Sequence, residues 1–397
     1  MIYHLSHLKN ESGMALITGL VILVLLTAIG TYAINLTQID QTLSANLKAS
    51  KQAFYLADAG IEWGKQRVLT DANMPPSPAG STQNLNSGSY TVAFKDILPQ
   101  ALAWQYRITV EATGNIGPDS VKASKTLQAF VTKTYDISDG AITMRGNEAH
   151  SQFEGDSFQV DGRDYYYNNQ TGQWELTSSP PQVGISVPNT TLESVVEGAL
   201  SSQQKDNVQG LGGTSSVPSV GVSTSLSSSA ITAVANTLCS SAHSYTPILI
   251  DTQISGDKTY GTRTSPQITC FDGIGVPGLM GVEFSGNVSG AGILIVKHAD
   301  LLTRGNLNFE GLVIVTGNKV GFGMWGGGEV YGSVIINETS TDGSSYRELW
   351  LKGNAEIKRS LSALSLAKGL IPLSTISGII SGLPTSIQQV SWTEVQK

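Results

Sequence analysis

Residues 11–38 read ESGMALITGLVILVLLTAIGTYAINLTQ, and this stretch decides how the whole chain is organised. No charged residue occurs from Ser12 to Ile39, and the sequence from Met14 to Ile34 is almost unbroken apolar chain. A helix needs about 20 apolar residues to cross a hydrocarbon core of about 30 Å, and a charge at its centre would be costly. The stretch therefore predicts one transmembrane helix at residues 14–34, with the bulk of the chain on one side of a membrane.

The composition narrows the classes of protein that fit. The chain has 397 residues, which allows two or three domains with ample buried core. Charged residues make up 14% of it, against roughly 25% in ordinary soluble domains, and Gly occurs 43 times. The net charge is −7, whereas a nucleic-acid binder would show a basic stripe. We therefore expect no nucleic-acid partner.

A short polar leader, residues 1–13, precedes the apolar stretch. Lys9 is its one firm positive charge, which favours an N-terminus on the cytoplasmic side. A secretory signal peptide would have an apolar region of about 7–15 residues followed by a small-residue cleavage site. The apolar run here is longer and continues into more helix. Because Gly13 lies at the polar–apolar junction, a protease could act before the apolar segment rather than after it.

Beyond the membrane span, residues 35–70 form one apolar stripe at helical period. The stripe comprises Leu36, Ile39, Leu43, Leu47, Phe54, Ala57, Ile61 and Val68. The helix should end before Pro75. At residues 80–135, segments that alternate apolar and polar residues predict three antiparallel strands. We expect the helix to dock on this small sheet, with Leu43, Leu47, Phe54 and Ile61 in the shared core.

These features together resemble a known family. A leader that ends in Gly13, an apolar helix and the block AFYLADAGIEWG at residues 53–64 are similar to the N-terminal region of PilX-type pilus assembly proteins. These proteins are minor pilins of the type IV pilus system of Gram-negative bacteria. The resemblance covers roughly residues 9–70. It implies that prepilin peptidase cleaves after Gly13 and that Met14 becomes the N-methylated first residue of the mature protein.

The position of Thr18 departs from the pattern of major pilins, which carry Glu at the fifth mature position. In that family the carboxylate pairs with the N-terminal amine of a neighbouring subunit, and a buried charge is costly unless it is paired. A subunit without this Glu suits the tip or an initiating complex. The same departure is usual among PilX-type and K-type tip pilins, the latter being subunits of type II secretion pseudopili. The partners implied are other minor and major pilins, prepilin peptidase and inner-membrane lipid.

From about residue 136 the sequence changes character. Residues 136–180 predict the start of a β-rich domain, and residues 181–270 are low in charge and read as an inserted subdomain with two helices, one capped by Asn189. This segment contains Cys239 and Cys270. If the domain lies outside the cytoplasm, these residues could form a disulfide; two unpaired buried thiols are the alternative.

The last third, residues 271–397, contains an internal repeat. Segments that begin with Gly occur at residues 286–296, 305–315 and 326–336, with a degenerate copy from Gly353. Repeats of about 20 residues cannot bury their own apolar face, so they predict a parallel β-helix or solenoid; an antiparallel meander is the competing interpretation. Stacking would place Ile293, Leu312 and Ser333 in one ladder, with Ile295, Ile314 and Ile336 in the wall or core beside it.

Several motifs could carry chemistry, although each has a simpler interpretation. The match GFGMWG at residues 321–326 precedes a strand rather than a helix, so its glycines indicate solenoid corners rather than a nucleotide site. Phe322, Met324 and Trp325 could form an exposed contact patch or a packed corner. The turn from Asp161 to Asp164 offers oxygen ligands for Ca²⁺, but an intervening Arg favours a salt-linked turn. We expect no metal and no cofactor.

The sequence thus predicts an α+β protein with a long N-terminal helix, a small antiparallel sheet and a C-terminal β-solenoid. The favoured function is structural, as a minor pilin of pilus initiation at or near the tip, held as a single-pass inner-membrane protein before assembly and in the periplasm and pilus afterwards. Its head could contact an extracellular surface or a glycan. The alternatives are a K-type pseudopilin and a membrane-anchored carbohydrate-active β-helix enzyme. An enzyme would need acidic and basic residues to converge on one wall, where the candidates are Glu283, Lys297, Asp300, Arg304 and Glu310.

Overall fold

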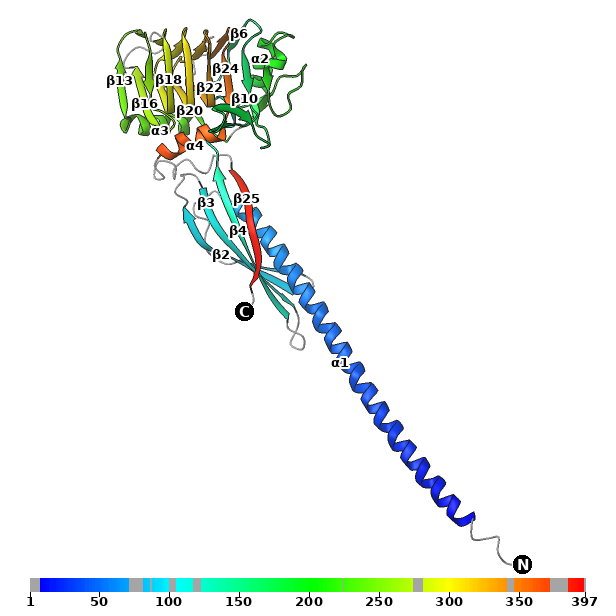
Figure 1. Ribbon diagram of the computed structural model, residues 1–397. Coiled ribbons are helices and arrows are strands. Elements are labelled where there is room, and N and C mark those ends of the chain that lie inside the picture. Colours follow the sequence, from blue (N-terminus) through cyan, green and yellow to red (C-terminus); the bar gives the residue numbers. More distant parts are fainter. Residues whose placement is uncertain are drawn as a thin grey trace, which may run out of the picture.

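The molecule has three parts that follow one another in space: a long helix, a small antiparallel sheet packed on its upper end, and a β-solenoid that lies across the far end of the sheet (Figure 1). This architecture confirms the predicted α+β class. The computed structural model describes residues 8–70, 81–85, 88–99, 105–116, 123–223, 225–273, 281–340, 346–371 and 385–395.

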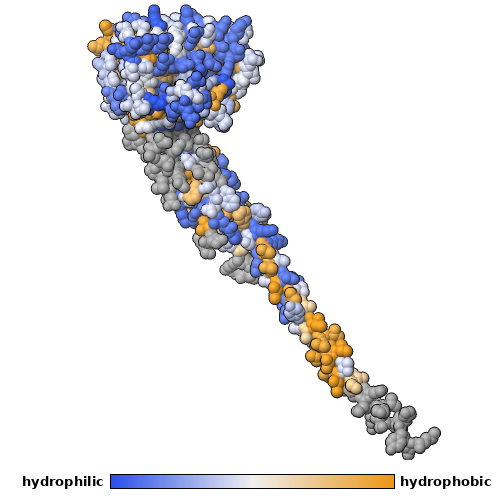
Figure 2. Space-filling model, in the orientation of Figure 1, coloured by the Kyte–Doolittle hydropathy of each residue, from blue (hydrophilic) through white to orange (hydrophobic). Residues whose placement is uncertain are grey.

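The long helix α1 spans Leu8–Thr70 and contains 63 residues. At 1.5 Å per residue it is about 95 Å long. It therefore begins inside the predicted leader and runs unbroken through both the apolar and the amphipathic segments. Its free half forms the most hydrophobic surface visible on the molecule (Figure 2), and the predicted Pro-rich stop at residues 75–78 lies outside the described residues.

The small sheet has five antiparallel strands rather than the three that we expected, in the order β1-β2-β3-β4-β25. The strands are β1 Ser81–Leu85, β2 Gly88–Pro99, β3 Gln105–Ile116, β4 Ala123–Tyr135 and β25 Thr385–Val395. The assignment of residues 271–397 to the solenoid was therefore wrong at its end, because the chain returns and β25 pairs with β4. The whole solenoid is an insertion between two neighbouring strands of the small sheet.

Small residues bring α1 close to this sheet. Ala53 and Ala57 of the AFYLADAGIEWG block are completely buried. A Cβ on Gly60 would lie 2.8 Å from the Cβ of Ala112, and one on Gly64 would lie 2.4 Å from a methyl of Val110. The block thus has a physical role, because its small side chains form the surface on which the sheet packs.

The predicted core of this part was only partly right. Ile61 is buried and Phe54 is partly buried, but Leu43 and Leu47 are more than half exposed. The apolar stripe continues below the point where the sheet ends, and the first buried residue of α1 is Ala49. The stripe from residue 36 to residue 47 therefore faces no part of the described chain.

The solenoid is built from two long sheets of parallel strands, which confirms the predicted β-solenoid over the meander. The 12-stranded sheet contains β5 Gly140–Met144, β7 Gln159–Asp161, β10 Val183–Val187, β11 Val208–Gln209, β12 Val220–Val222, β13 Ser244–Ile248, β15 Lys258–Tyr260, β16 Gln267–Gly273, β18 Asn287–Lys297, β20 Asn306–Gly317, β22 Gly328–Glu338 and β24 Glu356–Arg359. The six-stranded sheet contains β6 Ser151–Glu154, β14 Thr252–Ile254, β17 Gly281–Phe284, β19 Asp300–Thr303, β21 Phe322–Met324 and β23 Leu349–Lys352. An antiparallel hairpin, β8 Tyr165–Asn168 with β9 Gln173–Leu176, packs on these coils through the stacked rings of Trp174 and Tyr331.

The repeat register is as predicted for the first ladder, in which Ile293, Leu312 and Ser333 are neighbours. Beside it, Ile314 is the partner of Ile295 and of Ile335, whereas Ile336 is the partner of Val315. Ile336 is thus one residue out of step with Ile295 and Ile314, and in a strand a shift of one residue exchanges the two faces. Ile336 therefore belongs to the solenoid interior, whereas Ile335 faces outward with its ladder neighbours.

Glycines at residues 292, 311 and 332 form the corner at which the long strands bend. Their φ angles are 116°, 135° and 139°, a region that L side chains rarely adopt. A Cβ on Gly332 would also lie 1.8 Å from the carbonyl oxygen of Gly311. The corner therefore needs glycine in each coil.

The coils do not stack in the order of the chain. The first coil, β5–β6–β7, pairs with the last one, β22–β23–β24. On its other side β5 pairs with β10, and β7 with β11. The chain thus enters the middle of the stack, builds one end, crosses to β13 at the other end, and returns coil by coil to its starting point (Figure 1).

Three helices complete the solenoid. They are α2 Thr190–Ala199, α3 Ser228–Ser240 and α4 Leu361–Leu370. The side chain of Asn189 caps α2, as predicted. Because β10, β11, β12, β13 and β16 all belong to the 12-stranded sheet, residues 181–270 are not a separate subdomain. Helix α3 instead carries the chain along the stack, across β22, β20, β18 and β16.

Candidate functional site

The exposed half of α1 is the first candidate site. Every described side chain from Met14 to residue 48 is exposed, and the apolar part reaches a mean hydropathy of 2.4 with none of it buried. Gly13 and Met14 are consecutive residues within α1, far from the globular parts (Figure 1). The helix is long and apolar enough to span a membrane, and these features fit membrane anchoring.

The threonine hydroxyls in this half are satisfied by the helix itself. The hydroxyl of Thr18 donates to the carbonyl of Met14 at 2.8 Å, and that of Thr27 donates to Leu23 at 2.7 Å. Thr31 likewise donates to Thr27 at 2.8 Å. In lipid an unpaired polar group is costly, so these threonines cost little there. Thr18 consequently needs no hydrogen-bond partner from another chain.

A disulfide links Cys239, at the end of α3, to Cys270 in β16, with a Cα–Cα distance of 5.4 Å. Both residues are buried. The bond closes a loop of 31 residues that includes β13, β14 and β15. The disulfide therefore links α3, which crosses the stack, to the coils at the end of the solenoid that contains β13 and β16.

The charged residues proposed for an enzymatic wall do not converge. Two of the five pair with each other, and each of the other three has a partner from outside the set. The pairs are Glu283 with Arg304 (3.1 Å), Lys297 with Asp272 (2.9 Å), Glu310 with Arg263 (2.6 Å) and Asp300 with the hydroxyl of Tyr346. Burial raises the pKa of Asp300 to about 6, although its carboxylate also accepts a hydrogen bond from the backbone N–H of Gly321 at 2.7 Å.

The Asp161–Asp164 turn is held by protein contacts. Arg163 forms an ion pair with the fully buried Asp161 at 2.6 Å. Asp164 accepts hydrogen bonds from the hydroxyl of Thr177 at 2.9 Å and from the backbone N–H of Leu361 at 2.8 Å. The two carboxylates therefore serve different partners. Within the described ranges, no group of three or more His, Cys, Asp or Glu side chains could hold a metal ion.

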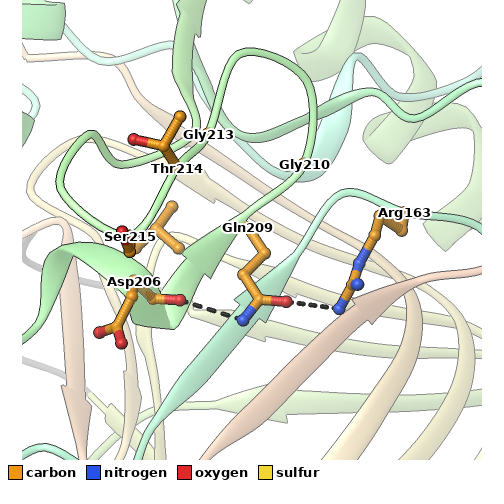
Figure 3. A pocket seen from close by; sticks show the side chains of 8 residues that line it. Arg163, Asp206, Gln209, Gly210, Gly213, Thr214 and Ser215 are labelled. Atoms are coloured by element: carbon orange, nitrogen blue, oxygen red, sulfur yellow. Dashed lines mark hydrogen bonds between the residues drawn. The ribbon is translucent and has the colours of Figure 1, made fainter.

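A polar pocket of about 380 Å³ opens beside this turn (Figure 3). Gln209 lies between its two charged sides, where its side-chain oxygen accepts from Arg163 and its nitrogen donates to the carbonyl of Asp206 at 3.1 Å. The loop that contains Thr214 and Ser215 forms the opposite wall. The pocket could take a small polar molecule, but its lining contains no aromatic ring and no convergent catalytic pair.

The corner motif at residues 321–326 behaves as a structural corner. A Cβ on Gly326 would lie 2.0 Å from the carbonyl oxygen of Gly305, so the glycines are needed for close stacking of coils. Phe322 and Met324 are buried in the core and belong to no exposed patch. Trp325 lies outside, and its ring centroid is 4.3 Å from that of Trp350. No local sequence pattern predicts this pair, because the two residues are 25 positions apart.

One comparison with known proteins concerns α1 directly. Residues 12–62 match the family model described as PilX N-terminal. Among solved structures, the chain is similar to the competence-associated pilin ComZ from Thermus thermophilus, with 13% sequence identity, 87% of this chain and 98% of that chain covered, and a TM-score of 0.26. No curated protein matches the chain. The segment that matches the PilX N-terminal model therefore lies entirely within the long helix α1.

Proposed function

We propose that this protein is a minor pilin that takes part in the initiation of a type IV pilus and stays at or near the tip. The observation that carries the proposal is the match of residues 12–62 to the PilX N-terminal model on a helix whose lower half is apolar, uncharged and unpacked. Such a surface is stable in lipid, and it is equally suited to a bundle of similar helices. The subunit is held in the inner membrane with its N-terminus in the cytoplasm, and it is then drawn into the filament.

The tip position is supported by Thr18 and by the shape of the head. Thr18 has a hydroxyl in place of a carboxylate, and this hydroxyl bonds to its own helix. The residue therefore offers no negative charge to the terminal amine of another subunit. The solenoid lies across the end of the small sheet and extends beyond it sideways (Figure 1). A subunit within the shaft would need room for this head among its neighbours, whereas a subunit at the end of the fibre has open space above it.

The test is cleavage after Gly13 by prepilin peptidase. Gly13→Leu should block maturation, and the protein should accumulate in the membrane with its leader attached. Because residue 13 lies far from the sheet and the solenoid (Figure 1), the head should fold as before. Gly19→Ala is a matched control within the same helix, since no atom lies within 4 Å of its added Cβ. Maturation of the Gly13→Leu variant to a start at Met14 would contradict the proposal.

A K-type subunit of a secretion pseudopilus would use the same helix, and the absence of Glu at Thr18 suits it equally. Deletion of the gene distinguishes the two roles, because a different process is lost in each case. Loss of surface pili supports the type IV pilus, whereas loss of secretion with intact pili supports the pseudopilus.

A further inference from the structure

Two partly buried tryptophans lie side by side at the wall of the solenoid formed by the six-stranded sheet. Trp350 lies in β23, and Trp325 directly follows β21 on the preceding coil. Their rings meet edge to face, with an interplanar angle of 63°. Helices α3 and α4 pack on the 12-stranded sheet, on the side of the stalk (Figure 1). Among the described helices, only α2 reaches the six-stranded sheet, at β6.

The two rings are held in fixed positions. The indole N–H of Trp350 donates to Oε1 of Glu154 at 3.0 Å. The guanidinium of Arg347 lies 3.8 Å from the ring centre of Trp350, and that of Arg304 lies 4.7 Å from the ring centre of Trp325. Aromatic rings that are fixed before a ligand arrives lose little entropy on binding.

The position of Trp325 is poor for stability. Its indole nitrogen is buried and has no hydrogen-bond partner among the described residues, which is a cost that Phe would avoid. The neighbouring Gly323 leaves the space that the ring occupies, because a Cβ there would lie 3.4 Å from this nitrogen and 2.8 Å from a methyl of Leu302. A ring kept at such a cost on an outer wall indicates a use beyond packing.

The polar groups around the rings are mostly paired. Arg304 pairs with Glu283 at 3.1 Å, and Lys352 pairs with Glu154 at 2.8 Å. The Lys352 hydrogen bond lowers the pKa of Glu154, so its carboxylate stays ionised. Arg347 adds one further positive charge. The site therefore offers hydrogen-bond donors and acceptors beside the rings with little net charge, and it favours a ligand that is polar but not strongly charged.

We propose that Trp325, Trp350 and the side chains around them bind a neutral chain of hexopyranose sugars. The C–H face of a pyranose is apolar and would take the place of the guanidinium groups that lie over the two rings. The displaced guanidinium groups and the neighbouring carboxylates and ammonium group would then pair with the sugar hydroxyls. Adjacent coils are about 4.8 Å apart, which is close to the length of one sugar unit. A chain laid along the solenoid axis would therefore meet successive coils in step. The inference rests on the proposed function for one point only, which is that the head is displayed outside the cell.

The test measures binding by the full-length protein, purified in a detergent without a sugar headgroup. Immobilised cellohexaose, maltohexaose and chitohexaose are the neutral probes, and polygalacturonate is the acidic one. Retention on at least one neutral probe is expected. Trp350→Ala and Trp325→Ala should each weaken it tenfold or more, and Trp350→Phe should weaken it less because a ring remains. Trp392→Ala is the matched control, since Trp392 is exposed on β25 of the other sheet.

Three results would overturn the inference: no retention on any neutral probe, retention on polygalacturonate alone, or equal retention by wild type and Trp350→Ala. Thermal unfolding of each variant shows whether the head is intact, and Trp350→Phe reports on the ring if Trp350→Ala does not fold. Binding is measured before any assembly. A failure here is therefore distinct from a failure of cleavage after Gly13, which would contradict the pilin function.

Discussion

Gly60 and Gly64 determine how closely α1 approaches the small sheet. A side chain at Gly64 would meet a methyl of Val110 at 2.4 Å, and one at Gly60 would meet Ala112 at 2.8 Å. The two glycines are four residues apart, so they lie on one face of the helix. Glycine within a helix costs about 1 kcal/mol relative to alanine. The close contact offsets that cost, because it buries the helix face formed by Ala53 and Ala57.

Gly64→Ala should therefore destabilise the stalk. The variant gains helix propensity but forces the helix and the sheet apart, and overpacking of this kind costs about 1–3 kcal/mol. Gly30→Ala gains the same propensity with no atom within 4 Å of its Cβ. We expect the thermal transition of Gly64→Ala to lie below that of Gly30→Ala. Equal transitions would show that the contact is looser than described.

Asp300 makes the stability of the solenoid depend on pH. Burial raises its pKa to about 6, above the value of 3.8 for a free carboxyl. The folded state then binds the proton more tightly than the unfolded state, so this group's contribution to stability falls as pH rises from about 4 to about 6 and stays low above that. Burial also raises the pKa of Glu348 to about 7, which acts in the same direction.

Asp300→Asn should remove this cost. The variant is expected to gain up to about 3 kcal/mol relative to wild type at pH 7.5 and little at pH 4, since one pKa unit is worth about 1.4 kcal/mol. Asn keeps an oxygen for the N–H of Gly321. Denaturant unfolding at the two pH values measures the difference. A variant that is less stable than wild type at pH 7.5 would contradict the assignment.

At the scale of elements, sequence patterns predicted helix α3 but not its course along the stack, and they did not predict the pairing of the last strand. The repeat at residues 286–336 predicted the returning coils correctly, because each coil carries Gly and apolar residues at the same spacing. The coils β5–β7 and β10–β12 lack that spacing, so residues 181–270 read as a separate unit. Pairing between distant segments leaves no local signal, and the same holds for β25 on β4.

The disulfide between Cys239 and Cys270 should stabilise mainly the part of the solenoid in which α3 crosses the stack of coils. Replacing both residues by Ser removes the closure of a 31-residue loop, which is worth roughly 3–4 kcal/mol on the chain-entropy model. The solenoid transition in denaturant should shift accordingly, while the stalk should be affected less. A reducing agent should reproduce the shift in wild type and leave the double variant unchanged. A wild-type transition that is insensitive to the reducing agent would contradict the role.

At the scale of the whole molecule, the solenoid is tied to the stalk at its entry and its exit. Asp136, which follows β4, pairs with Arg359 at the end of β24 at 2.7 Å, and Lys368 of α4 lies 3.6 Å from the same carboxylate. Close by, the buried Arg145 pairs with Asp139. A head fixed in this way moves together with the small sheet and with helix α1, on which that sheet packs.

From sequence, the apolar helix and its amphipathic continuation were predictable because their period is local. The Trp325–Trp350 surface was not, because it depends on coil stacking.

Thr18→Glu tests the tip position. The variant would offer a carboxylate to the terminal amine of a neighbour, so the protein should spread along the shaft rather than remain at one end. Immunogold labelling of sheared filaments measures the distribution. Thr27→Ser is a control that keeps a hydroxyl in the same helix. Labelling confined to one end in the Thr18→Glu variant would weaken the role given to residue 18.

The most direct test of the pilin function is the N-terminus of the protein recovered from sheared surface filaments. Mass spectrometry of its first peptide should show a chain that begins at N-methylated Met14 and retains the whole apolar stretch. A chain that begins at Met1, or one that begins after the apolar stretch, would contradict it.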